Sequence, residues 1–114
     1  MARIITLGSL NLDFTYQLPK PLEVGETLSS LSYRCGAGGK GANQSIAAAR
    51  AGAEVYHAGR IGSDGALLRR TLADSGVKLD FLVEVQTPTE HSVVLFNDGG
   101  DNSIVLYSGA NRTI

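Results

Sequence analysis

Two short stretches of the sequence combine residue types that could do chemistry, and the first is the pair Asn11 and Asp13. These residues follow an apolar segment and stand two positions apart. In an extended chain, side chains at that spacing point to the same side, so an amide and a carboxylate would face one ligand. A carboxylate accepts hydrogen bonds from hydroxyl groups, and an amide both donates and accepts them. The pair suits a sugar, although an isolated N-x-D sequence is also typical of residues that cap local turns.

The second stretch is CGAGGKGANQ, from Cys35 to Gln44, which holds four glycines and one lysine and leads into an alanine-rich segment. A glycine loop before a helix lets the N-terminal amides approach a ligand, and such a helix end favours oxygen-rich or anionic groups. The same pattern also fits a glycine turn that lets a helix pack closely against a sheet, with Lys40 in solvent. The glycine pattern alone leaves both interpretations open.

The Walker phosphate loop, G-x-x-x-x-G-K-[ST], does not fit this stretch. Arg34 stands where the leading glycine should be, and Gly41 follows Lys40 where a magnesium-binding hydroxyl is required.

The dinucleotide fingerprint G-x-G-x-x-G does match Gly36, Gly38 and Gly41, but its context is poor. The fingerprint should follow the first strand of a βαβ unit and precede an acidic residue by about 20 positions. Here the first apolar strand ends at Gly8, and Arg60 stands where the acid is expected. A nicotinamide-dependent oxidoreductase therefore remains as a second alternative.

Hydrophobic patterns indicate the elements that would position these residues. An apolar run predicts a buried strand over 3–7, and two further strands are expected over 54–59 and 81–85. Helical spacing predicts a helix over 40–50 and a second one that Ser63 or Asp64 caps and that runs to Ala73. This alternation of strands and helices predicts a parallel sheet with right-handed crossovers.

The remaining segments predict a second set of strands. Residues 14–18 and 31–35 alternate between apolar and polar types, which is typical of half-exposed strands. HSVVLFN and NSIVLYS flank the turn DGGD and predict a hairpin. Because VVLF and IVLY are apolar at successive positions, both faces of this hairpin need cover.

Composition restricts the function classes. The chain has 114 residues, 43% of them apolar, and a net charge of −1, so it carries no basic footprint for nucleic acid or for an anionic membrane surface. The single cysteine, Cys35, and the early break in the N-terminal apolar run predict a cytoplasmic protein. His57 and His91 have no second ligand at metal-binding spacing, so no metal site is expected.

The segments GSLNLDF, GGKGANQSIAAARAGAEV, IGSDGAL and SGAN, taken together, resemble the ribokinase family within the wider PfkB-type carbohydrate kinases. The resemblance implies an α/β fold with a parallel-sheet, Rossmann-like core and a small β-sheet lid formed by segments of about 14–35 and 91–107. It implies that a sugar is bound by residues of both stretches, namely Asn11, Asp13, Gly39, Lys40, Gly41 and Asn43. It also implies a homodimer formed through the lid sheet.

The same resemblance implies what the 114 residues lack. In this family the catalytic base belongs to a later G-x-G-D motif, which the sequence does not contain, so no catalytic residue is assigned here. We therefore expect residues 1–114 to be the N-terminal part of an ATP-dependent kinase of a pentose such as ribose, inactive alone. The complete enzyme would use ATP with Mg²⁺, and the resemblance allows a monovalent cation. A non-catalytic module for sugar binding or dimerisation is the third alternative.

Overall fold

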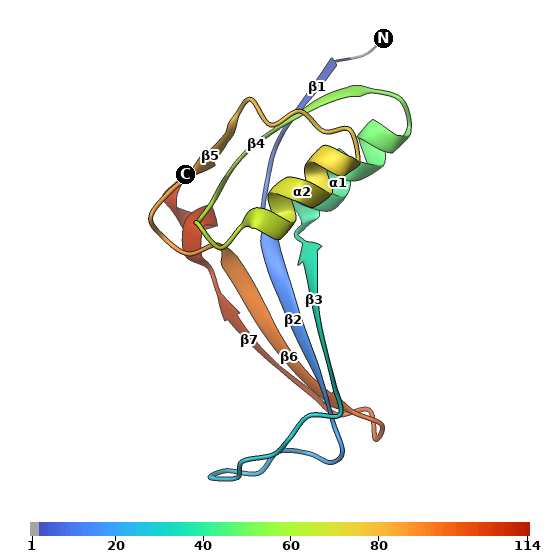
Figure 1. Cartoon of the computed structure of the whole chain (residues 1–114), viewed down its shortest axis with the longest axis vertical. Helices are drawn as coiled ribbons and strands as arrows, with labels where there is room; N and C mark the ends of the chain where they lie inside the picture. The colour runs from blue at the N-terminus through green and yellow to red at the C-terminus, as the bar shows by residue number, and fades with distance from the viewer. Residues whose placement is uncertain (1–2) are drawn as a thin grey trace.

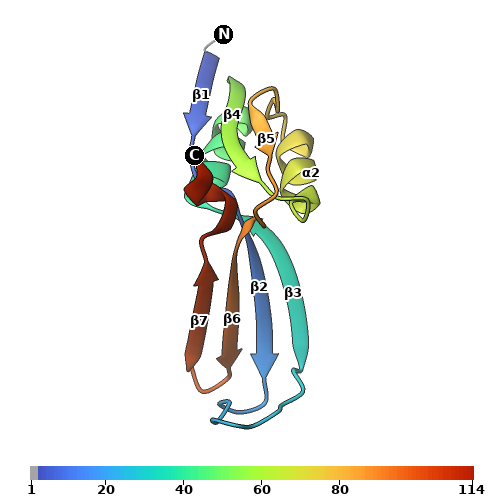
Figure 2. The same cartoon turned by 90° about the vertical axis from the view of Figure 1, so that its left-hand side faces the viewer.

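The computed structural model describes residues 3–114, which form two sheets joined end to end (Figure 1). The first sheet is parallel and has the strand order β1-β4-β5. Its strands are β1 (Arg3–Leu7), β4 (Glu54–Ile61) and β5 (Leu82–Glu84). The helix α1 (Lys40–Arg50) leads into β4, and α2 (Ala66–Asp74) connects β4 to β5. The two helices lie side by side on one face of the sheet (Figures 1 and 2). This arrangement confirms the predicted α/β fold with a parallel core.

The second sheet has four strands in the order β3-β2-β6-β7 and extends away from the helices (Figure 2). Strands β2 (Asn11–Leu18) and β6 (Glu90–Asn97) are parallel, whereas β3 (Ser32–Gly38) and β7 (Asn102–Tyr107) pair antiparallel with them. A short 3-10 helix, η1 (Gly109–Thr113), follows β7. Long connections therefore bring the predicted hairpin, β6 and β7, beside β2 and β3 in one layer.

The core lies between the two helices and the parallel sheet. Leucine and valine side chains from both layers fill it, together with the small Ala42 of α1, which is 1% exposed. Small residues on the inner face of α1 let the helix approach the sheet closely. Gly52 and Gly76, each with a positive φ angle, follow the two helices, where left-handed residues commonly end a helix.

Two local predictions were wrong. Neither Ser63 nor Asp64 caps α2 with its side chain, because Gly65 occupies the N-cap position. Asp64 instead accepts hydrogen bonds from Thr89. Strand β1 is not buried, since Ile5 and Leu7 are 65% and 67% exposed. Their exposure follows from the layering, because the helices cover only one face of the parallel sheet (Figure 2).

The longest helix of the described part of the chain, α1, has 11 residues, and no helix there could cross a membrane.

Candidate sugar-binding site

A polar cluster lies where β2 begins, beside the glycine segment. The Asn11 amide donates a hydrogen bond from Nδ2 to Oδ1 of Asp13 over 2.8 Å, as expected for side chains on the same side of a strand. Ser92, the register partner of Asp13 on the neighbouring strand β6, donates its hydroxyl to the same oxygen over 2.7 Å. Two donors occupy the two lone pairs of Asp13 Oδ1. We call Asn11, Asp13 and Ser92 the polar cluster.

Two acceptor oxygens of this cluster are free of partners within residues 3–114, and both face Gly38. A Cβ atom placed on Gly38 would lie 2.5 Å from Asp13 Oδ2 and 3.2 Å from Asn11 Oδ1. Only glycine leaves room beside these oxygens, which explains its presence at this end of β3. The pairing register puts Asn11 directly opposite Gly38, so the two stretches singled out in the sequence meet here. Two free acceptors side by side suit a ligand that offers two hydroxyl groups.

The rest of the glycine segment packs against the connection between β1 and β2. Gly39 has a φ of 101°, and a Cβ on it would lie 2.5 Å from the carbonyl oxygen of Ser9. A Cβ on Gly41 would lie 2.4 Å from the carbonyl carbon of Gly8. The Ala42 amide donates to the Ser9 carbonyl over 3.1 Å, so one of the N-terminal amides of α1 is already used. Close packing alone is therefore sufficient to require glycine at position 41.

Lys40 and Asn43 stand in the first turn of α1, three residues apart and thus near one another on the helix surface. Both residues are exposed, and among the described residues neither side chain makes a hydrogen bond or an ion pair. The fold brings the helix start to the polar cluster through Gly38 and Gly39. Within residues 3–114, neither the Lys40 nor the Asn43 side chain forms a hydrogen bond or an ion pair with Asp13.

Two hydrogen bonds from the Asn111 side chain hold the main chain just before the polar cluster, and the sequence did not indicate them. The Asn111 amide, in η1, accepts a hydrogen bond from the Leu10 N–H over 3.2 Å and donates one to the Leu10 carbonyl over 3.0 Å. This paired contact fixes the residue just before Asn11. SGAN belongs to the segments that resemble the family, but only the folded chain joins Asn111 to Leu10, because 101 residues separate them.

A buried histidine bonds to the connection between β1 and β2, which leads into the polar cluster. His57 of β4 and Ser45 of α1 are both 0% exposed, and the Ser45 hydroxyl lies 2.7 Å from Nδ1 of His57. Nε2 of His57 lies 3.1 Å from the Gly8 carbonyl, so this nitrogen carries the proton and Nδ1 accepts from Ser45. Burial lowers the pKa of His57, and the bond to Gly8 opposes this only partly. A neutral imidazole therefore joins β4 and α1 to the chain that leads into the site.

The Asp64 carboxylate fixes the start of β6 and thus the strand that carries Ser92. Its Oδ1 accepts the Thr89 N–H over 2.9 Å and the Thr89 hydroxyl over 2.6 Å. Oγ1 of the buried Thr89 accepts in turn from the Gly62 N–H over 2.9 Å. Partial burial raises the pKa of Asp64, but the hydrogen bonds from Thr89 outweigh it and leave that pKa lowered. The charged form of Asp64 is the one that suits these donors.

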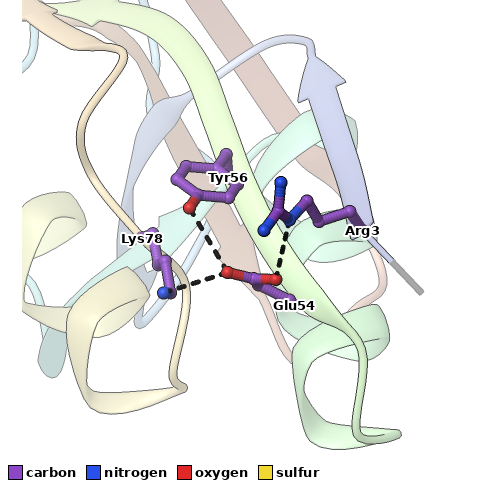
Figure 3. A network of polar contacts seen from close by, with 4 residues as sticks. All are labelled: Arg3, Glu54, Tyr56 and Lys78. Atoms are coloured by element: carbon purple, nitrogen blue, oxygen red, sulfur yellow. Dashed lines mark hydrogen bonds and ion pairs between the residues drawn. The ribbon is translucent and has the colours of Figure 1, made fainter. Parts of the chain in front are cut away.

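A second polar group, the surface network, consists of Arg3, Glu54, Tyr56 and Lys78 (Figure 3). It lies where β1 and β4 begin, at the end of the parallel sheet opposite to the polar cluster, which follows the end of β1. Glu54 accepts from Arg3 over 3.0 Å, from Lys78 over 3.2 Å and from the Tyr56 hydroxyl over 3.3 Å. The bonds from Arg3 and Lys78 lower the pKa of Glu54. Within residues 3–114, no three His, Cys, Asp or Glu side chains gather as metal ligands would.

Comparisons with known proteins agree with this fold. The pfkB family of carbohydrate kinases matches residues 1–114, and the chain belongs to this family. Among curated proteins, the ribokinase of Bacillus subtilis (strain 168) is 39% identical over 119 residues, covering 100% of this chain. The chain spans 40% of the length of that relative.

Solved ribokinase structures superimpose closely on the chain. The structure of Arabidopsis thaliana ribokinase complexed with ribose and ATP has a TM-score of 0.92 and 38% identity, covering 97% of this chain and 38% of the other. Ribokinase from Cryptococcus neoformans var. grubii serotype A in complex with ADP has a TM-score of 0.86 and 41% identity, covering 96% and 35%. The predicted resemblance is confirmed at the level of family and fold.

The match to the dinucleotide fingerprint has a different structural meaning. Gly36 and Gly38 belong to β3, an antiparallel strand of the second sheet, whereas the fingerprint belongs in the turn after the first strand of a parallel βαβ unit. The glycines therefore do not form the turn that binds a pyrophosphate in that fold.

Proposed function

We propose that this chain is the sugar-binding and lid portion of an ATP-dependent carbohydrate kinase that transfers the γ-phosphate to a hydroxyl of a pentose, namely ribose. In this proposal Asn11 and Asp13 bind sugar hydroxyls, and the segment 39–43 completes the pocket through Gly39, Lys40, Gly41 and Asn43. The family membership and the ribokinase relatives support the reaction class.

One observation carries the proposal for the site, namely the pair of free acceptors beside Gly38. Asp13 Oδ2 and Asn11 Oδ1 lie against the same glycine, so adjacent hydroxyls of one sugar could donate to both. Ribose offers such adjacent hydroxyls, whereas 2-deoxyribose lacks one of them. A site built to bond a hydroxyl discriminates strongly against the analogue without it, because a polar group then loses its partner.

Phosphoryl transfer depends on positioning and on the stabilisation of charge. The residues described here supply positioning, since they hold the hydroxyl-bearing carbons of the sugar in a fixed orientation. Within residues 3–114 no three His, Cys, Asp or Glu side chains gather as metal ligands, and the sequence has no G-x-G-D motif for the base. We propose that the base and the sites for ATP, Mg²⁺ and any monovalent cation belong to the complete enzyme, and that the chain alone is inactive.

The second sheet would serve as the lid. It starts at the polar cluster and extends beyond the helical part of the molecule (Figure 1), so it could lie over a bound sugar. Excluding water from the site prevents hydrolysis of ATP and strengthens the polar contacts inside.

The kinase proposal is tested with the longest open reading frame that contains this chain. We expect ATP-dependent phosphorylation of ribose, with weaker activity on 2-deoxyribose, and no activity for residues 1–114 alone. Sugar binding without phosphorylation by the longest reading frame would instead identify a non-catalytic sugar-binding module. No response to any sugar in a panel of pentoses, hexoses and nucleosides would overturn the proposal.

Dimerisation through the lid sheet is proposed from the outer strand β7. Its four apolar residues, Ile104 to Tyr107, are between 47% and 68% exposed, and β7 is an edge strand. An exposed apolar edge strand is a template for pairing with another chain. We expect a dimer in sedimentation experiments and a monomer for Val105→Lys, while a wild-type monomer would contradict this part of the proposal.

A further inference from the structure

We propose that Ser92 is a positioning residue for sugar recognition, which fixes the Asp13 carboxylate so that only Oδ2 meets the ligand. This inference rests on the proposed function. The family resemblance places Ser92 in a lid segment but assigns it no part in sugar binding, and its distance of 79 residues from Asp13 in the sequence gave no indication of one.

The hydrogen bonds of Asp13 Oδ1 come from two directions. Asn11 donates from the same strand, over 2.8 Å, and Ser92 donates from the neighbouring strand β6, over 2.7 Å. A single donor leaves the carboxylate free to turn about the bond to that donor, whereas two donors on different strands define its plane. Ser92 and Asn11 are 7% and 9% exposed, so little water competes for these bonds.

The two oxygens of the Asp13 carboxylate therefore have different roles. Oδ1 has both lone pairs occupied by the protein, so a sugar hydroxyl can bond only to Oδ2. Oδ2 lies beside Asn11 Oδ1 at Gly38, and a ligand must therefore place two donors in defined positions. Without the Ser92 hydroxyl, Oδ1 regains an acceptor position and the carboxylate can turn away from Gly38. The site would then accept hydroxyl groups in more than one arrangement.

A purely structural role for Ser92 predicts something different. If its hydroxyl only stabilised the pairing of β2 with β6, its loss would lower the melting temperature and would weaken the binding of all sugars by the same factor. A positioning role predicts, besides any change in melting temperature, a change in the preference between sugars, which a purely structural role would not produce. The two roles are therefore separable by one set of binding measurements.

The experiment uses the longest open reading frame that contains this chain and measures the Kd of ribose and of 2-deoxyribose by calorimetry. We expect Ser92→Ala to raise the Kd of ribose about tenfold, because a misplaced Oδ2 of Asp13 would lose its charged hydrogen bond to a ribose hydroxyl, taken at the low end of the range for such bonds. The ratio of the Kd of 2-deoxyribose to the Kd of ribose should become smaller. The variant Ser92→Thr keeps the hydroxyl, so its Kd for ribose and its ratio of the two Kd values should lie within about twofold of wild type. The control Ser75→Ala removes a hydroxyl bonded to the Thr71 carbonyl at the end of α2 and should change neither value.

A double-mutant cycle with Asp13→Asn isolates the coupling. If Ser92 acts through Asp13, Ser92→Ala should add little in the Asp13→Asn background, because coupled residues are not additive. A Kd for ribose within twofold of wild type in Ser92→Ala, or full additivity with Asp13→Asn, would overturn the inference while leaving the kinase proposal intact. Failure of the wild-type protein to bind any sugar would overturn the proposed function itself.

Discussion

Two carboxylates at opposite ends of the parallel sheet have very different surroundings. Glu54 belongs to the surface network, where two cationic groups and a hydroxyl use its acceptor capacity (Figure 3). Asp13 belongs to the polar cluster, where two neutral donors hold one oxygen and the other has no partner within residues 3–114. The comparison shows how to distinguish a carboxylate that completes a surface from one that can still bind a ligand. The two features that distinguish such carboxylates are the charge of the donors that bond to the carboxylate and whether one of its oxygens lacks a partner.

The largest expected effect is on sugar affinity, and it should appear on one side of the comparison only. Asp13→Ala should weaken binding of ribose by about 1.5 to 3 kcal/mol, the value of a hydrogen bond to a charged group. Glu54→Ala is the matched control at the other end of the parallel sheet, and the Kd of ribose for this variant should equal that of wild type. Calorimetry with the longest reading frame measures both. Equal effects of the two variants, or sugar affinity within twofold of wild type for Asp13→Ala, would contradict the assigned role.

A second prediction concerns the packing beneath the polar cluster. Gly41→Ala should destabilise the fold by about 1 to 3 kcal/mol, because the new methyl group would overlap the main chain of Gly8. Gly36→Ala is the control, since no atom lies within 4 Å of a Cβ placed there. Urea denaturation gives the two free energies of unfolding. A Gly41→Ala variant as stable as Gly36→Ala would show that α1 can shift without cost.

The pH dependence of stability should separate the two regions. Burial lowers the pKa of His57 from its usual 6.5, so below pH 6.5 the unfolded chain binds more protons than the folded one. The free energy of unfolding should therefore fall as the pH drops from 7 through 6.5 toward the folded-state pKa. His57→Gln should remove this dependence, whereas Glu54→Gln should leave it. Denaturation curves between pH 5 and 8 check it, and an unchanged slope in His57→Gln would contradict it.

The smallest effect is expected at the surface network. The pKa of Glu54 is lowered from its usual 4.5 by Arg3 and Lys78, so its contribution is present above pH 4.5 and is lost as the pH falls through the lowered value. Exposed ion pairs contribute little and are screened by salt. The stability difference between wild type and Glu54→Gln at pH 7 should be small at low ionic strength and should disappear at high salt. A difference that survives high salt would indicate a buried role for Glu54.

Much of the fold could be predicted from the sequence because its patterns are local. The expected strand over 54–59 and the expected helix over 40–50 lie close to the observed bounds of β4 and α1. The wrong predictions depended on long-range contacts. Asp64 bonds to Thr89 rather than to its own helix, and β1 is exposed because only one face of the parallel sheet carries helices.

The candidate site divides in the same way. Asn11, Asp13 and the glycine segment were selected from residue types and spacing, and the pairing of β2 with β3 does bring Asn11 to Gly38. The sequence could not indicate Ser92, Asn111 or the pair of Ser45 and His57. Each is a common residue type whose partner lies far along the chain. Lys40 and Asn43 were selected with the segment, and their roles stay predictions.

The sequence by itself determined the family and the order of the elements, because glycines, apolar periods and short polar motifs act over a few residues. The tertiary structure alone decided which oxygens of the polar cluster are free. That outcome depends on strand register, since β6 must pair with β2 in one alignment to place the Ser92 hydroxyl beside Asp13. A shift of one residue would turn that side chain to the other face of the sheet.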